Sequence, residues 1–356
     1  MITDADAEFH PPDAGDPTWG ETNFFGFYSA EVPLNVGVYT LFRPNLGVVG
    51  STICMNSGDA PAPWRADFCD MQSHLPIPEP RSLATYSLAS GLRVTTLAPN
   101  ERWHLGYDDG DGTSIDVTYQ ALMPAFDIHD PEMDPISAAQ QRQAARGGSD
   151  GDGGSNGGFA WGTAYNGHFD QTGHYSGAVV LRGRRIPIEC TSTMDHSWGP
   201  RAERGGPNMS WLHAHFSDDY AVHAIFSFDE TRGGRDLELA HGYVLTNGTV
   251  RGLAAGRGVT ARDGDFFART VELEVTDAAG DTHHLTGQGL TRFPWQAWPN
   301  MVGFNVLARW QSSWLSGGPG EQSGQGGQAG YGEIQDFVDL TRLTRGQAVG
   351  SVPVAD

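Results

Sequence analysis

Short runs of β-prone residues, separated by turn residues, constrain the fold of this chain more than any other feature. Val36 to Phe42 is one such run, and Arg43-Pro44-Asn45 ends it with a predicted turn. In Ser114 to Met123 apolar and polar residues alternate, which is typical of a strand with one solvated face. Many of the 48 glycines and 21 prolines fall at predicted turns. The sequence therefore predicts an all-β protein.

The predicted strands form two groups of similar size. The first group is 23–28, 36–42, 46–55, 83–89, 92–98, 103–107 and 114–123 with the hairpin 175–190, and the second is 211–216, 220–228, 239–245, 267–275, 283–290 and 304–310. Helix is predicted for Ile136 to Arg146, and a strand followed by a short helix for Tyr331 to Leu343. Comparable strand content in the two halves predicts duplicated β domains.

We place the domain boundary close to Pro200–Pro207, which gives domains 1–202 and 203–356. The glycine-rich tract 147–158 is then a surface excursion of the first domain rather than a linker between domains. A second Gly/Gln-rich loop is predicted for 317–330.

Charge and composition exclude several classes of protein. A net charge of −21 with only 22 Lys and Arg argues against nucleic-acid binding and against docking on anionic lipid. No run of about 18 apolar residues occurs, so no membrane-spanning helix is predicted. Met1 to Phe9 lacks the apolar region of a signal peptide, and the three cysteines lack paired spacing. We expect a cytoplasmic protein.

The segment Thr193 to Arg201 concentrates an acid, an imidazole and an indole. A buried Asp195 with a raised pKa can deliver a proton, His196 can relay or orient it, and Trp198 can stabilise a carbocation. A structural interpretation fits equally well: Asp195 caps a turn, His196 is a core histidine and Trp198 fills a seam between domains.

A second cluster lies in the predicted strand 211–216, where Trp211, His213 and His215 share one face. Two such histidines can chelate a metal if His223, His241 or Asp195 supplies a third ligand. No third ligand stands at a recognisable spacing, so we expect no metal and an aromatic-lined pocket instead.

Three further features are weaker. Trp295 and Trp298 belong to an aromatic cluster that suits either a ligand-binding mouth or a core corner. Glu21 is a further candidate acid, whereas Asp218-Asp219 fits a turn between strands. The GxGxxG, GxxxxGK[ST], GxSxG and HExxH motifs are absent, so no cofactor is expected.

The segment Met194 to Gly199 resembles the junction motif of the carotenoid 1,2-hydratase-like, AttH-like proteins. The wider pattern is similar to an uncharacterised bacterial branch, through Asp16 to Glu21, Gly177 to Leu181 and Gly330 to Glu333. The resemblance implies two tandem lipocalin-like β-barrels and a large apolar ligand. Relatives include carotenoid hydratases, kievitone hydratase and fungal cyclases that close decalin rings.

His196 and Trp198 match the His-x-Trp of the carotenoid hydratases. Those enzymes also use a downstream Tyr and Asp, for which Tyr220 and Asp218 or Asp219 are the nearest candidates.

Together these features predict a cofactor-independent hydratase, dehydratase or isomerase for a hydrophobic isoprenoid, terpenoid or steroid-like substrate. Asp195 is the predicted proton donor, His196 its partner or the base for water, and Trp198 the cation-stabilising wall. The predicted substrate-binding residues are Arg201, Trp211, His213, His215, Tyr220, Trp295, Trp298 and Glu21. The alternatives are a non-catalytic binding protein for an apolar ligand and a pericyclase that folds a polyene.

Overall fold

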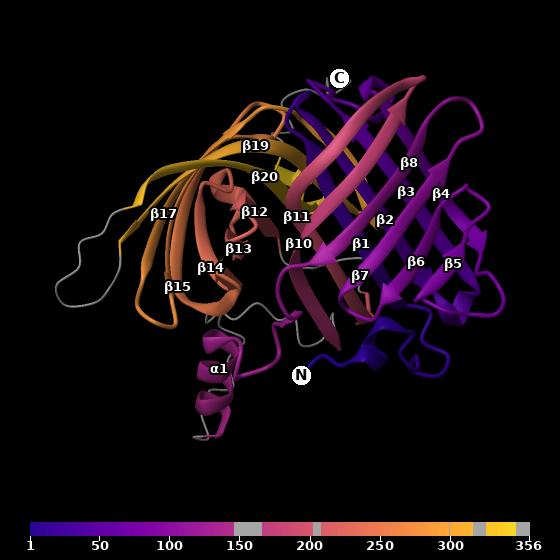
Figure 1. Ribbon diagram of the computed structural model, residues 1–356. Helices are drawn as coiled ribbons and strands as arrows, with labels where there is room; N and C mark the ends of the chain where they lie inside the picture. The colour runs from indigo at the N-terminus through magenta and orange to yellow at the C-terminus, as the bar shows by residue number, and fades with distance from the viewer. Residues whose placement is uncertain (146–165, 202–207, 299, 316–324, 347–356) are drawn as a thin grey trace, which may run out of the picture.

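The computed structural model describes residues 1–145, 166–201, 208–298, 300–315 and 325–346 (Figure 1). Almost every described element is a strand, so the all-β prediction is confirmed. The strands form two antiparallel sheets, one of eleven strands and one of nine. None of the described helices is long and apolar enough to cross a membrane.

The first sheet contains the strands up to Pro200. They are β1 (Trp19–Ser29), β2 (Leu34–Arg43), β3 (Val48–Asn56), β4 (Phe68–Pro76), β5 (Thr85–Ser87), β6 (Arg93–Ala98), β7 (Arg102–Asp108), β8 (Ser114–Ala121), β9 (Phe126–Asp127), β10 (Gly167–Leu181) and β11 (Arg184–Pro200). Their order is β4-β3-β2-β1-β11-β10-β8-β7-β6-β5, with β9 on β10. The sheet curls into an open trough, in indigo to magenta in Figure 1.

The second sheet contains the strands from Met209 onward. They are β12 (Met209–Ser217), β13 (Tyr220–Ser227), β14 (Asp236–Thr246), β15 (Thr249–Arg262), β16 (Ala268–Asp277), β17 (Thr282–Gly289), β18 (Phe293–Trp298), β19 (Met301–Leu315) and β20 (Gln325–Asp339). Pairing of β17 with β19 closes this sheet into a barrel, and β18 extends it. Tandem lipocalin-like domains are thus confirmed, with the difference that only the second is closed.

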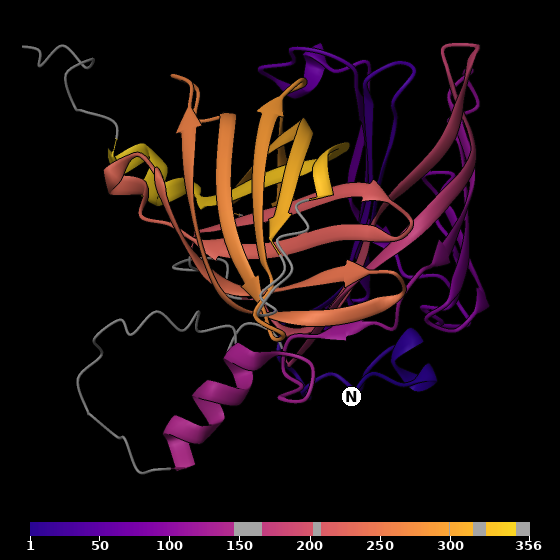
Figure 2. The same cartoon turned by 60° about the vertical axis from the view of Figure 1, so that its left-hand side comes forward.

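Two α-helices and four short 3-10 helices, Asp4–Ala7, Pro44–Leu46, Pro63–Arg65 and Glu230–Arg232, complete the described structure. Helix α1 (Pro135–Ala145) confirms the helix predicted after Asp134, and it projects from the lower end of the barrel in both views (Figures 1 and 2). Helix α3 (Leu340–Gly346) follows β20 directly, as predicted for the C-terminal strand and short helix.

Two loop predictions have different outcomes. The tract 147–158 lies outside the described residues. The loop predicted for 317–330 is wrong in part, because 325–330 belongs to β20 and pairs with β19. The boundary near 200–207 stays a prediction, supported by the passage of the chain from the first sheet to the second between Pro200 and Met209.

Strand β1 is buried along its whole length because it serves two cores. Successive side chains of a strand point to opposite faces. Phe25 and Phe27 therefore pack inside the first sheet, while Phe24 packs against Trp211 and Trp295 of the second sheet. This third core between the two sheets contains the candidate site.

Candidate functional site

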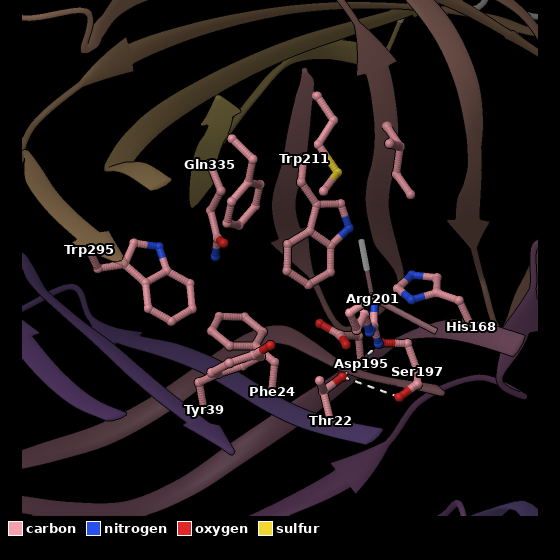
Figure 3. Close-up of a pocket in the computed structure, with 13 residues that line it drawn as sticks. Thr22, Phe24, Tyr39, His168, Asp195, Ser197, Arg201, Trp211, Trp295 and Gln335 are labelled. Carbon is pink, nitrogen blue, oxygen red and sulfur yellow. Dashed lines mark hydrogen bonds between the residues drawn. The ribbon is translucent and has the colours of Figure 1, made fainter. Parts of the chain in front are cut away.

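A cavity lies between the two sheets, with free space of about 50 Å³, enough for a few water molecules (Figure 3). Its walls come from both sheets and are mostly aromatic, with one acid, one imidazole and one guanidinium. The lining residues are Thr22, Phe24, Tyr39, His168, Asp195, Ser197, Arg201, Met209, Trp211, Ile225, Trp295, Gln335 and Phe337.

Asp195 is the acid that faces this cavity, from the middle of β11. It is 6% exposed, and among the described residues none donates a hydrogen bond to its carboxyl group. Burial, reinforced by the charge of Asp170, raises the pKa of Asp195 to about 8 and outweighs His168 and Arg201. A carboxyl group in this setting keeps its proton at neutral pH, which suits a general acid.

Arg201 places a permanent positive charge in the same wall. Its Nη2 donates to the Ser197 hydroxyl over 2.7 Å, and that hydroxyl lies 2.7 Å from the Thr22 hydroxyl (Figure 3). The guanidinium is thereby oriented towards the cavity, where it can bind a substrate oxygen. Arg201 lowers the pKa of Asp195 without overcoming burial, so its presence is compatible with a protonated Asp195.

His168 and Asp170 form an ion pair beside Asp195 that the sequence analysis missed. His168 Nε2 lies 3.0 Å from Asp170 Oδ2, and His223 Nε2 lies 3.1 Å from the same oxygen. Burial opposes both charges, yet the histidines hold the pKa of Asp170 far below its ordinary value, and Asp170 raises that of His168. The pair therefore stays charged next to a neutral Asp195.

The predicted hairpin 175–190 contains the signal that would have revealed this pair. Its turn lies at Arg182 and Gly183, and extending the ladder in register sets Asp170 opposite Asp195 and His168 opposite Ser197. The hairpin is confirmed, but its strands run on to residues 167 and 200. The motif predicted at a junction thus lies within a continuous strand.

His196 and Trp198 do not join Asp195, so the proposed pairing of His196 with Asp195 is wrong. Neighbouring residues of β11 point to opposite faces of the sheet. His196 Nδ1 donates to the Thr22 carbonyl over 2.6 Å, and its Nε2 lies 3.4 Å from Glu21 Oε1. Trp198 stacks on His196 there, with ring centroids 5.1 Å apart. Glu21 likewise faces away from the cavity.

Trp211, His213 and His215 share one face of β12, as predicted, but only Trp211 lines the cavity. His213 Nδ1 lies 2.8 Å from His223 Nδ1 behind the cavity wall. Burial holds the pKa of His215 at about 3 and that of His213 well below its ordinary value, so both are neutral. Within the described residues no third ligand joins His213 and His215 at metal-binding distance.

The remaining predicted residues lie in different places. Trp295 lines the cavity opposite Trp211, whereas the Trp298 side chain lies outside the described part of the chain. Tyr220 is not a cavity residue, since its hydroxyl bonds to His283 Nδ1 over 3.0 Å in the second barrel. Asp218 is part of the turn between β12 and β13, as predicted.

A second buried acid, Glu333, lies in a smaller adjoining cavity that shares Phe24 and Trp295 with the first. Its carboxylate accepts hydrogen bonds from Asn35 over 2.6 Å and from Gln335 over 2.7 Å. Burial raises the pKa of Glu333 to about 7. The segment Gly330 to Glu333 belongs to the family resemblance, which implies no chemistry for Glu333.

Comparison with known proteins identifies the fold. Structures of CghA with Sch210972 (11% identity, 96% of each chain, TM-score 0.55) and of an AttH protein from Nitrosomonas europaea (10% identity, 92% of this chain and 95% of that chain, TM-score 0.52) are similar. Kievitone hydratase from Nectria haematococca also matches (9% identity, 95% of this chain and 93% of that chain, TM-score 0.48).

At these identities the shared property is the fold, and the AttH-like fold expected from the motif is confirmed. A comparison with curated protein sequences finds no match. A family model described as a domain of unknown function, DUF7064, matches residues 3–332, and the chain therefore belongs to the DUF7064 family.

Proposed function

We propose that this protein is a lyase or isomerase that protonates a hydrophobic small molecule, with Asp195 as the general acid. The observation that carries the proposal is a buried carboxyl group in an aromatic cavity, with a pKa raised to about 8 and no hydrogen-bond donor among the residues that the structure describes. Strongly perturbed pKa values of this kind cluster at functional sites, which supports a catalytic role for Asp195. CghA, which shares the fold, has been crystallised with Sch210972.

In the proposed reaction Asp195 donates its proton to a substrate alkene or hydroxyl group. An alkene becomes a carbocation, while a protonated hydroxyl leaves as water and gives the same kind of cation. The faces of Phe24, Trp211 and Trp295 stabilise this cation through their quadrupoles. Addition of water, or loss of a proton from a neighbouring carbon, completes hydration, dehydration or double-bond migration and returns one proton to Asp195.

The neighbours of Asp195 lower the cost of its transient ionisation. The carboxylate that forms faces Arg201 and the cationic His168, both of which favour its charged state. The fixed anion of Asp170 keeps His168 positioned and charged. The charges of Arg201, His168 and Asp170 therefore stay the same while Asp195 donates its proton and takes one back.

The cavity space of about 50 Å³ is too small for a whole terpenoid or steroid. Binding such a substrate requires the aromatic side chains to move apart, and the adjoining Glu333 cavity is the space into which the site can extend. A hydrophobic isoprenoid-like substrate fits the aromatic lining best.

Incubation with a panel of isoprenoids, terpenoids and steroids, followed by mass spectrometry, tests the proposal. A gain or loss of water, or an isomer of unchanged mass, is the expected product. Asp195→Asn should reduce turnover by about two to four orders of magnitude, whereas the surface variant Asp218→Asn should not. Full turnover by Asp195→Asn would refute the assignment.

The same panel separates the alternatives. A ligand that binds tightly and returns unchanged indicates a binding protein. A cyclised product whose formation tolerates Asp195→Asn but not Trp295→Ala indicates a pericyclase that acts by shaping its substrate.

A further inference from the structure

A second polar cluster lies on the opposite face of β11 from Asp195, where the N-terminal segment crosses the end of the first sheet. His10 Nδ1 lies 2.7 Å from Glu21 Oε1, and His10 Nε2 lies 3.0 Å from Asp6 Oδ1. His196 Nε2 lies 3.4 Å from the same Glu21 oxygen. Residues distant in the sequence thus meet at one buried carboxylate.

The hydrogen-bond partners fix how each ring can be used. The Thr22 carbonyl can only accept, so His196 Nδ1 carries hydrogen and its Nε2 faces Glu21. That Nε2 is buried, and none of the described residues forms a hydrogen bond with it. His10 Nε2 donates to Asp6, and its Nδ1 lies 2.7 Å from Glu21 Oε1, where it either donates a proton to that oxygen or shares a metal ion with it. In its neutral form His196 therefore turns the lone pair of Nε2 towards a carboxylate oxygen, a contact that requires a proton or a metal ion between the two atoms.

Two arrangements of positive charge can neutralise this cluster. Asp6 and Glu21 contribute two negative charges, which are balanced either by protons on both imidazoles or by one divalent cation. The histidine positions favour the cation, because metal-binding histidines commonly donate their other N–H to a carboxylate or a backbone carbonyl. Asp6 and Thr22 provide those two acceptors here.

We infer that His10 Nδ1, Glu21 and His196 Nε2 bind one divalent transition-metal ion of the zinc class. Their ligand atoms lie within 4.8 Å of one another. A tetrahedral ion with bonds of about 2.0–2.1 Å separates its ligand atoms by about 3.4 Å, so the pair formed by Glu21 and His196 already has the required spacing. His10 Nδ1, now 2.7 Å from Glu21 Oε1, has to move away from that oxygen to reach the same spacing.

The ion attaches the N-terminal segment to β1 and β11. His10 stacks on Trp198 with ring centroids 3.7 Å apart and an interplanar angle of 5°, which holds the ring in the ligand position. The sequence predicts a metal-free protein because His213 and His215 lack a third ligand at a recognisable spacing, and the present inference departs from that prediction at a different set of residues. The site is independent of the proposed acid chemistry, because Asp195 faces the other side of the strand.

Metal content of the purified full-length protein tests the inference directly. After dialysis against a chelator, titration with Zn²⁺ should show one ion bound per chain, with release of up to two protons. Co²⁺ in the same site should give the visible absorption of a tetrahedral ion. The thermal unfolding temperature should rise when the ion binds.

Two variants and a matched control locate the ion. Glu21→Gln and His10→Ala should each lower zinc affinity at least about tenfold. His174→Ala is the control, since His174 also bridges two carboxylates, Glu189 over 2.9 Å and Asp218 over 3.1 Å, on an exposed surface. It should bind zinc like the wild type. Asp195→Asn should keep the ion, which separates this test from that of the proposed function.

Absence of a stoichiometric ion at micromolar zinc would overturn the inference in favour of two protonated histidines. Unchanged binding in the His10 variant would overturn it as well. If Glu21→Gln fails to fold, His10→Ala decides the question, because His10 precedes the first strand and lies outside both sheets.

Discussion

Replacing Asp195 with Asn should stabilise the protein while it abolishes the proposed activity. The carboxyl group has a pKa of about 8 in the folded chain against 3.8 as its ordinary value. Between these values the unfolded chain releases the proton and the folded chain retains it. The stability that the protonated group contributes is therefore complete below about pH 3.8 and is lost as the pH rises towards 8.

The magnitude follows from the difference between the two pKa values. At about 1.36 kcal/mol for each pKa unit, the wild type loses up to about 6 kcal/mol by pH 8. Relaxation and water penetration reduce such costs, so about half of this is a realistic expectation. An Asn side chain has the shape of the protonated acid and no charge to release. Asp195→Asn should thus be more stable than the wild type by about 3 kcal/mol at pH 8.

Urea unfolding at about pH 5.5 and about pH 8 measures this effect. The stability advantage of the variant should grow by about 2 kcal/mol between the two conditions. Asp218→Asn is a control of opposite sign: hydrogen bonds from Thr191 and His174 outweigh burial and lower the pKa of Asp218, so its replacement should destabilise slightly. An advantage that does not change with pH would show that Asp195 is ionised in the folded protein and would refute the reasoning.

Further predictions concern the surroundings of the site. Asp170→Asn removes the counter-ion of the buried His168 and the carboxylate that faces His223, and should cost about 3–5 kcal/mol, measured by urea unfolding. Gly332→Ala sets a Cβ 2.0 Å from a backbone carbonyl oxygen of β12 and should cost more than about 3 kcal/mol, whereas Gly264→Ala, with nothing within 4 Å, should cost less than about 0.5 kcal/mol. Glu333→Gln should leave turnover unchanged well below pH 7 and alter it above, because the acid ionises at about that pH. Trp295→Ala should enlarge the cavity and shift the substrate preference towards bulkier molecules. Competition assays with the same panel measure this preference.

A short sequence motif predicted which residues lie near the site but not which of them face the cavity. The separation of Asp195 from His196 follows from the alternation of any strand, whereas the motif was predicted at a junction between domains rather than inside β11. His168 and Asp170 were missed because the hairpin was ended too early. Both errors concern the length of a strand, which depends on pairing along the whole ladder rather than on the composition of a few residues.

Sequence alone determined the β class, the division into two strand groups, helix α1 and the location of an acidic, aromatic segment, because these depend on turn residues and on side-chain period. Tertiary structure decided which face each residue serves and which distant residues meet. Glu333 lies beside Asn35, and His10 lies beside Glu21 and His196, through packing of elements far apart in the chain. The pKa of Asp195 is likewise a tertiary property, since burial between two sheets raises it and no neighbouring residue in the sequence could do so.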